Sequence, residues 1–344
     1  MSSSAGSGSL ARYILVRIIL VIPMMLILLT VVFLLLRVAP GDPVSASVGG
    51  RLPPAILAQK RAALGLDQPL YQQYLEYLGH VVRFNFGTTI SDNQPVLSVI
   101  RDKGGATLTL TVGAFLIALV LGLPLGRLAG RYRDSGADAV IRIFGIVTYA
   151  APIFWVGVLL VAFVAAHFPS WPTYGIASAQ TTFVVPTHTH ILIVDSIIAN
   201  YWSGVFDILK HCVLPCITLG LLITGVIIRL VRVNVIQALK GDYVEAARAR
   251  GVPEGRVVRK HAFRNALVPV ITVIGLQVAL TLSGAVLTET TFNWPGVGTA
   301  LVNYLNERDY TAVQGLVTFF AVVVVIVSLL VDILNALVDP RVRY

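Results

Sequence analysis

Two groups of residues have types and spacing that suit metal binding. Cys212 and Cys216 lie four residues apart, with His211 beside the first, so in a helix they share one face. His188 and His190 form a His-x-His pattern in a separate, more polar stretch. A metal site needs further ligands and an open approach, whereas free cysteines in apolar helices usually behave as small hydrophobic residues. We therefore expect the cysteines to pack, and we assign no metal site.

The sequence also excludes a nucleotide-hydrolysing site of the P-loop type. Such a loop needs the pattern Gly-x-x-x-x-Gly-Lys-Ser/Thr, in which backbone amides and the lysine hold the phosphates. No Gly-Lys dipeptide occurs anywhere in the chain. We therefore expect no catalytic residues and no cofactor in this chain, which is not predicted to be an enzyme. A process driven by ATP would need a separate subunit.

A polar stripe runs along one predicted apolar helix. Gln277, Thr281, Gly284 and Thr288 fall on a single helical face. Polar groups are costly in hydrocarbon, so this face should point toward protein or toward a water-filled path. Both alternatives stay open: Gln277, Thr281 and Thr288 are candidates for a translocation path, or they serve helix packing. A second pattern, of small residues four apart, favours close packing of helices: Gly122, Gly126 and Gly130.

The elements that position these residues must lie in a membrane. The chain has 344 residues, of which 56% are hydrophobic and only 12% are charged, and its mean hydropathy is +0.81. Soluble domains carry about 25% charged residues. A disulfide-stabilised secreted protein is excluded, because two cysteines cannot stabilise a chain of this length. A disordered protein is excluded as well, because disordered chains are poor in apolar residues. The composition therefore predicts an all-α membrane protein that crosses the bilayer several times.

Six stretches without Asp, Glu, Lys or Arg are long enough to cross a bilayer, which takes about 20 apolar residues. They are Ile18–Leu36, Gly104–Gly126, Ile143–Phe168, His211–Ile228, Asn265–Thr288 and Tyr310–Val331. We expect the fourth to end near Arg229. A seventh stretch, Ile191–Leu209, contains Asp195 and Asp207, and is interpreted as an interfacial or extracytoplasmic segment.

The distribution of basic residues predicts the orientation of these spans. Six spans place both termini on one side of the membrane, and residues 229–264 hold nine basic residues. Lys and Arg accumulate in cytoplasmic loops. We therefore expect both termini, the loop between the second and third spans, and the loop between the fourth and fifth spans to lie in the cytoplasm. The net charge of +9 is therefore explained by topology, and we expect no nucleic-acid partner.

This topology divides the chain into four parts. Residues 1–12 are expected to be a disordered cytoplasmic tail. Residues 13–103 hold the first transmembrane helix and a long extracytoplasmic segment. Residues 104–338 form a five-helix core that includes a cytoplasmic loop at 233–264. Residues 339–344 form a cytoplasmic C-terminal tail.

The segment from Asp242 to Gly251 has the pattern of a short, well-defined helix. Asp242 and Glu245 have capping-box spacing, in which the first side chain accepts from a first-turn amide and the second reaches back to the cap. Gly251 can adopt the left-handed conformation that ends a helix. Ala246 and Ala247 lie in mid-helix, where small side chains would let a partner surface approach. The alternative is an amphipathic helix held by anionic lipid headgroups, which explains the arginines but not the caps.

The pattern Glu245-Ala-Ala-x-x-x-Gly251 resembles the EAA motif of ABC importer permeases. Further motifs around the spans resemble, across nearly the whole chain, the B-type permease subunit of dipeptide and oligopeptide ABC importers. Asn85 departs from the Asp that this family usually has before Phe-Gly. The other matching motifs are Ala39-Pro-Gly-Asp-Pro43, Leu64-Gly-Leu-Asp-Gln-Pro-Leu70, Thr291-Phe-Asn-Trp-Pro-Gly-Val-Gly298, Arg308-Asp-Tyr310 and Asp339-Pro-Arg341.

The resemblance implies a type I importer architecture with six transmembrane helices in the bacterial cytoplasmic membrane. It implies four kinds of partner: a second homologous permease, two ATP-binding subunits that hold ATP and magnesium, an extracytoplasmic substrate-binding protein, and the lipid bilayer. The ATPase-coupling residues would be Asp242, Glu245, Ala246, Ala247 and Gly251. The alternatives are a permease for nickel or glutathione and an ion-coupled secondary transporter, which often has acidic residues within its spans.

Overall fold

The apolar stretches of the sequence form long helices in the computed structural model, which describes residues 5–38, 53–63 and 65–338. Within these ranges all the regular elements are helices. They are α1 (Ala5–Val38), α3 (Pro54–Ala63), α4 (Leu70–Val82), α5 (Val96–Arg131), α6 (Gly136–Ala150), α7 (Ile153–His167), α8 (Ala179–Val184), α9 (Leu192–Ile198), α10 (Trp202–Ala238), α11 (Asp242–Ala249), α12 (Glu254–Arg256), the π-helix η1 (Val257–Ala262), α13 (Phe263–Thr291), α14 (Val297–Asn306) and α15 (Tyr310–Val338). The all-α fold class is confirmed.

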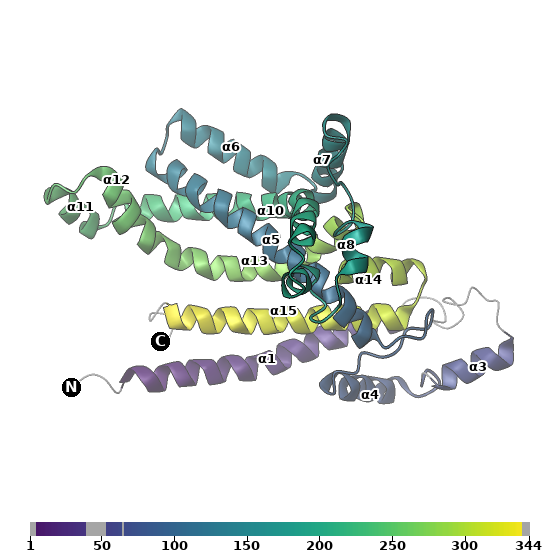
Figure 1. Cartoon of the computed structure of the whole chain (residues 1–344). Helices are drawn as coiled ribbons and strands as arrows, with labels where there is room; N and C mark the ends of the chain where they lie inside the picture. Colours follow the sequence, from purple (N-terminus) through teal and green to yellow (C-terminus); the bar gives the residue numbers. More distant parts are fainter. Residues whose placement is uncertain (1–4, 39–52, 64, 339–344) are drawn as a thin grey trace.

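Four of these helices are long and apolar enough to cross a membrane: α1, α5, α10 and α15. The bent pair α6–α7 could form a fifth span, and the predicted span Asn265–Thr288 lies within α13. Six crossings therefore fit the structure. Figure 1 shows α1 beside α15, while α5, α10 and α13 form the centre of the bundle. The start of α1 and the end of α15 lie toward the same end as α11, whereas α14 lies at the opposite end.

The predicted third span, Ile143–Phe168, is not one straight helix. Helices α6 and α7 meet at an angle of 104°. Pro152 causes the break, because proline has no amide hydrogen to donate and disfavours helical geometry in the residue before it. Ala151 accordingly adopts an extended conformation, with ψ 134°. The prediction of one continuous span was wrong here.

The fourth predicted span was wrong at both ends. Helix α10 begins at Trp202 rather than His211, so it includes the last part of the segment interpreted as interfacial, from Trp202 to Leu209, and the short α9 remains separate. Helix α10 also continues nine residues past Arg229 to Ala238, because arginine and lysine favour helices and a charge alone does not end one.

The N-terminal boundary also differs from the expectation. Helix α1 begins at Ala5, inside the segment predicted as a disordered tail, and residues 1–4 lie outside the described ranges. The turn motif at 39–43 and the C-terminal tail at 339–344 lie outside them as well.

Close packing of α5 on α10 forms the main core, and the predicted role of the glycines is confirmed. A Cβ atom on Gly122, Gly126 or Gly130 would lie 2.6–2.8 Å from a side-chain carbon of α10. Such distances are too short for carbon atoms, so these positions require glycine. The residues that fill the space on α10 are Ile227, Val231 and Val235. Cys216 also packs here, with its Sγ 3.7 Å from the Leu110 carbonyl oxygen, as expected for an apolar cysteine.

We predict that Gly126→Leu destabilises the bundle, because its side chain would displace Val231 on α10. Overpacking of this kind costs about 1–3 kcal/mol. Thermal unfolding of the purified chain in mild detergent checks this. Gly104→Ala in the same helix is the matched control, because no described neighbouring atom lies within 4 Å of a Cβ at that position. Equal unfolding temperatures for the two variants would contradict the packing role.

Candidate functional site

The basic loop, defined here as residues 239–262, connects α10 to α13 and contains the short helix α11. Helix α11 ends as the sequence predicts. Gly251 has a positive φ of 74°, and its amide donates to the Arg248 carbonyl at 2.9 Å. The amide of Val252 donates to the Ala247 carbonyl at 3.2 Å. These two hydrogen bonds form a Schellman motif, so a residue with a Cβ at position 251 would be strained.

The start of α11 differs from the predicted capping box. Asp242 is the first residue of the helix, and the cap position is occupied by Gly241, which makes no side-chain hydrogen bond. Glycine is compatible with the extended conformation of a cap residue. Because Gly241 occupies the cap position, Asp242 lies one residue past it and does not cap the helix. Asp242 and Glu245 instead lie exposed in the first turn, where carboxylates interact favourably with the helix dipole.

The two faces of α11 have different environments. Val244 and Ala247 are fully buried and pack against Val257 and Ala262 of the same chain. The expectation that Ala247 faces a partner was therefore wrong, because its small size lets α11 lie close to the second half of the basic loop. Ala246 is exposed and shares the outward side of the helix with the carboxylates of the first turn.

An ion pair closes the basic loop around Gly251. Arg248 donates to Glu254 through Nε at 3.0 Å and Nη2 at 2.7 Å. This hydrogen-bonded guanidinium lowers the pKa of Glu254 below its ordinary value, and the charge of Arg131 adds to the effect. Both partners are about half exposed, so the pair contributes little to global stability. Its effect is local: it holds α11 against α12.

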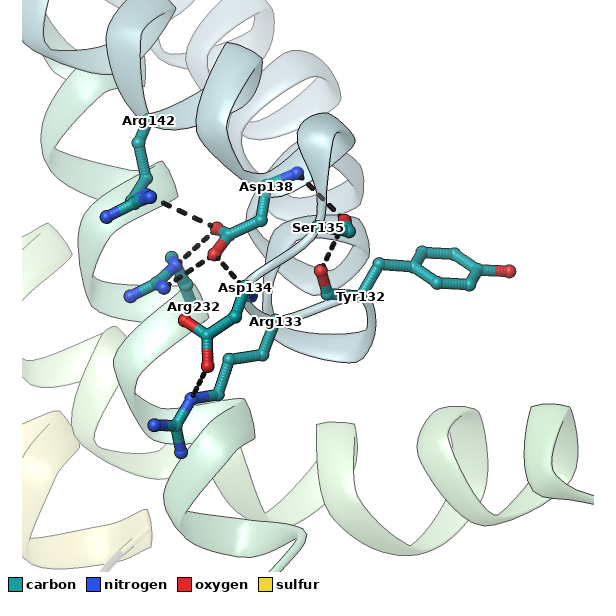
Figure 2. A network of polar contacts seen from close by, with 7 residues as sticks. All are labelled: Tyr132, Arg133, Asp134, Ser135, Asp138, Arg142 and Arg232. Atoms are coloured by element: carbon teal, nitrogen blue, oxygen red, sulfur yellow. Dashed lines mark hydrogen bonds and ion pairs between the residues drawn. The ribbon is translucent and has the colours of Figure 1, made fainter.

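A buried ion pair anchors the helix that leads into the basic loop (Figure 2). Arg232 of α10 donates to both carboxylate oxygens of Asp138 on α6, at 2.6 and 2.7 Å. Asp138 is fully buried, and it also accepts from the Asp134 amide at 3.0 Å. Arg142 lies 3.7 Å away. The sequence analysis missed this pair. One local signal was present in the sequence: Asp138 lies three positions after Ser135. The Ser135 hydroxyl caps α6 by accepting a hydrogen bond from the Asp138 amide.

Two threonines of the polar stripe of α13 lie inside the chain, whereas Gln277 is partly exposed. Thr281 and Thr288 are buried, and their hydroxyls donate to carbonyl oxygens of their own helix, those of Gln277 and Gly284. Gly284 faces α10, because a Cβ there would lie 3.2 Å from a carbon of Leu219. These contacts favour the packing alternative. A contribution of Gln277, Thr281 and Thr288 to a translocation path stays a prediction.

A buried carboxylate at the opposite end of the molecule was also missed. Glu289 is fully buried in α13, one residue beyond the predicted span. It accepts from the Thr107 hydroxyl at 2.6 Å and from the Thr299 amide at 2.9 Å, so it joins α5, α13 and α14. A Cβ on Gly296 or Gly298 would collide with this carboxylate, which explains the glycines at the cap and in the first turn of α14.

Trp294 belongs to the same junction. Trp294 is fully buried, and its Nε1 donates to the Ala106 carbonyl at 2.9 Å. The buried indole needs this partner, because an unsatisfied N–H in the core would be costly.

The metal-binding candidates are not brought together. His190 pairs with Asp102 at 3.1 Å, while Cys212 and Cys216 are buried in α10. Within the described residues, no group of three or more His, Cys, Asp or Glu side chains has a metal-binding arrangement.

Comparison with known proteins covers nearly the whole chain. The model of a family described as "Binding-protein-dependent transport system inner membrane component" matches residues 122–344, and the model of its N-terminal region matches residues 10–111. The dipeptide transport system permease protein DppB of Escherichia coli is 39% identical over 97% of this chain and 99% of the relative.

Two further relatives extend the comparison. A di/tripeptide transport system permease protein of Pseudomonas aeruginosa is 37% identical over 95% of this chain and 97% of its own length. The glutathione transport system permease protein GsiC of Salmonella choleraesuis is 33% identical over 97% of this chain and 99% of its own length.

We predict that Asp138→Asn lowers the free energy of unfolding by about 3–5 kcal/mol, because it leaves the charge of Arg232 without its buried partner. Denaturant titration of the purified chain in mild detergent measures the change. The double variant Asp138→Asn, Arg232→Leu should regain most of the loss. A single variant as stable as the unmodified chain would show that the pair does not anchor α10.

Proposed function

Because the chain belongs to the family of binding-protein-dependent transport system inner membrane components, we propose that it is the permease subunit of an ATP-driven importer of di- or oligopeptides. The observation that supports this most is end-to-end similarity to permeases named for dipeptide and di/tripeptide transport. Glutathione is the alternative solute, since a glutathione permease is also similar over the full length, and nickel is a second. The chain would itself be no enzyme.

The energy of transport would come from partner subunits. The sequence has no P-loop, so two ATP-binding subunits would hold ATP and Mg²⁺, and this chain would carry no cofactor. A second, homologous permease and an extracytoplasmic binding protein would complete the assembly. Nucleotide can drive alternating access only if it binds one conformation more tightly than the other.

Helix α11 is the element that we propose to dock on an ATP-binding subunit. Its inner face is occupied by contacts to Val257 and Ala262, so the face available to a partner carries Asp242, Glu245 and Ala246. The Schellman motif at Gly251 and the Arg248–Glu254 pair hold this face in one orientation. Motion of the partner would pass through the basic loop to α10 and α13.

We further propose that the basic loop and both termini lie in the cytoplasm, since Lys and Arg concentrate in the loop. The α8–α9 region would lie outside. The bacterial cytoplasmic membrane would be the location of the assembly.

We predict that the complete assembly, reconstituted in liposomes with its binding protein, imports a dipeptide when ATP is supplied on the ATPase side. Ala246→Trp should abolish this uptake and the substrate-stimulated ATPase activity, because a bulky side chain on the exposed face of α11 would keep the partner surface away. The thermal unfolding of the variant should be unchanged, since Ala246 is exposed.

Ala137→Trp is the matched control, because Ala137 is an exposed alanine on α6, outside the basic loop. It should retain uptake. Normal ATP-driven uptake by Ala246→Trp would contradict the docking role of α11. Uptake that needs an ion gradient and no ATP would instead support an ion-coupled transporter, while import of glutathione or nickel but not of the dipeptide would replace the substrate class.

The orientation can be tested by cysteine labelling with a membrane-impermeant reagent. A cysteine in place of Gly255 should react only from the cytoplasmic side, and one in place of Phe183, which is 91% exposed on α8, only from the outside. The unmodified chain is the control, because Cys212 and Cys216 are buried. Labelling of position 255 from outside would reverse the proposed topology.

A further inference from the structure

A basic pocket of about 290 Å³ lies between the end of α5 and the second half of the basic loop. Three arginines line it: Arg127 and Arg131, one helical turn apart on α5, and Arg259 on η1. The backbone of α12 also borders it, since a Cβ on Gly255 would lie 3.8 Å from Arg131 Nη1. The pocket therefore joins a membrane helix to the segment that carries α11.

The charges of this pocket are not balanced by neighbouring carboxylates. Within the described part of the chain, none of the three arginines forms an ion pair with an Asp or Glu side chain. The charge of Arg131 acts on Glu254, but both carboxylate oxygens of Glu254 are already hydrogen-bonded to Arg248. Three like charges around one cavity repel each other, so the site favours an anion that bridges them.

Aromatic rings hold two of the guanidinium groups in place without neutralising them. The Arg127 guanidinium lies over the ring of Phe263 at 5.4 Å, and that of Arg131 lies over the ring of Tyr132 at 5.0 Å. Such contacts stabilise a cation and leave its N–H donors available. An arrangement of fixed, unneutralised guanidinium donors suits the oxygens of a phosphate group.

The remaining lining residues indicate which phosphate compound fits. Pro124, Leu125 and Leu128 line the same pocket, and Pro124 and Leu128 are exposed. Pro124 and Leu125 lie within the predicted membrane span, which ends at Gly126, while Leu128 lies between Arg127 and Arg131 near the end of the helix. An apolar wall that leads to a basic rim matches an acyl chain followed by a phosphate headgroup. A soluble phosphate would use only the rim.

We propose that this pocket binds the headgroup of an anionic phospholipid, and that the lipid thereby bridges α5 and the basic loop. The inference depends on the membrane location of the chain and not on the peptide substrate. Failure of lipid binding would therefore leave the proposed transport function untouched, and failure of peptide uptake would leave the lipid site untouched.

The test measures binding of a fluorescent short-chain phosphatidylglycerol to the purified assembly in a non-ionic detergent. The triple variant Arg127→Gln, Arg131→Gln, Arg259→Gln should bind it on the order of 100-fold more weakly, because each basic residue near an anionic lipid contributes about a factor of five. The charge-retaining variant Arg127→Lys, Arg131→Lys, Arg259→Lys should recover much of the affinity. This variant also shows whether the glutamine variant has lost only its charges.

The matched control removes three exposed basic residues elsewhere, in the variant Arg83→Gln, Arg101→Gln, Lys103→Gln, and should bind as the unmodified assembly does. A phosphatidylcholine analogue should bind more weakly than phosphatidylglycerol, and millimolar inorganic phosphate should compete poorly. Unchanged lipid binding by the glutamine variant would overturn the proposal, and so would full competition by inorganic phosphate. A third result would overturn it as well: if the glutamine variant lost the ATP-binding subunits but still bound lipid, the arginines would be assigned to a protein contact.

Discussion

The close contact between α5 and α10 is the constraint on which the rest of the bundle depends. In a bilayer there is little hydrophobic gain from bringing two apolar helices together, so association relies on close packing and on satisfied polar groups. Gly122, Gly126 and Gly130 allow the backbones to approach, and the aliphatic side chains of α10 fill the space. The remaining central helices then pack around α10, with α13, α6 and α7 all in contact with it.

Polar interactions fix both ends of this apolar core. Arg232 and Asp138 join α10 to α6 near the basic loop, and Glu289 joins α13 to α5 and α14 at the opposite end. In each case a buried carboxylate receives at least two hydrogen bonds, as burial of a polar group requires. The junction of Glu289 also places a buried acid one residue beyond the fifth predicted span. The six predicted spans contain no Asp or Glu, which favours an ATP-driven importer over an ion-coupled transporter. This absence holds only if the fifth span ends at Thr288. The family match now carries that distinction.

Much of the fold followed from local sequence. The length of apolar runs predicted the helices, and glycine spacing predicted their closest contact, since both properties are encoded in neighbouring residues. The stop at Gly251 was predictable for the same reason. The bend at Pro152 and the true ends of α10 were missed because windows free of charge mark the hydrocarbon region, whereas a helix ends where its backbone hydrogen bonds end. The inward orientation of Ala247 and the Asp138–Arg232 pair depend on contacts between segments distant in sequence, which no local pattern records.

The uninterrupted length of α10 has a mechanical consequence. Its 37 residues extend over about 55 Å, well beyond the roughly 30 Å of the hydrocarbon core, so one helix, with Pro215 inside it, reaches from the α8–α9 region to the basic loop. The glycines Gly122, Gly126 and Gly130 of α5 contact the last third of this helix, at Ile227, Val231 and Val235, next to the basic loop. A shift of the basic loop would therefore be passed along one continuous helix to the α8–α9 region. A small displacement on one side of the membrane can thus reshape the opposite side without any helix unfolding.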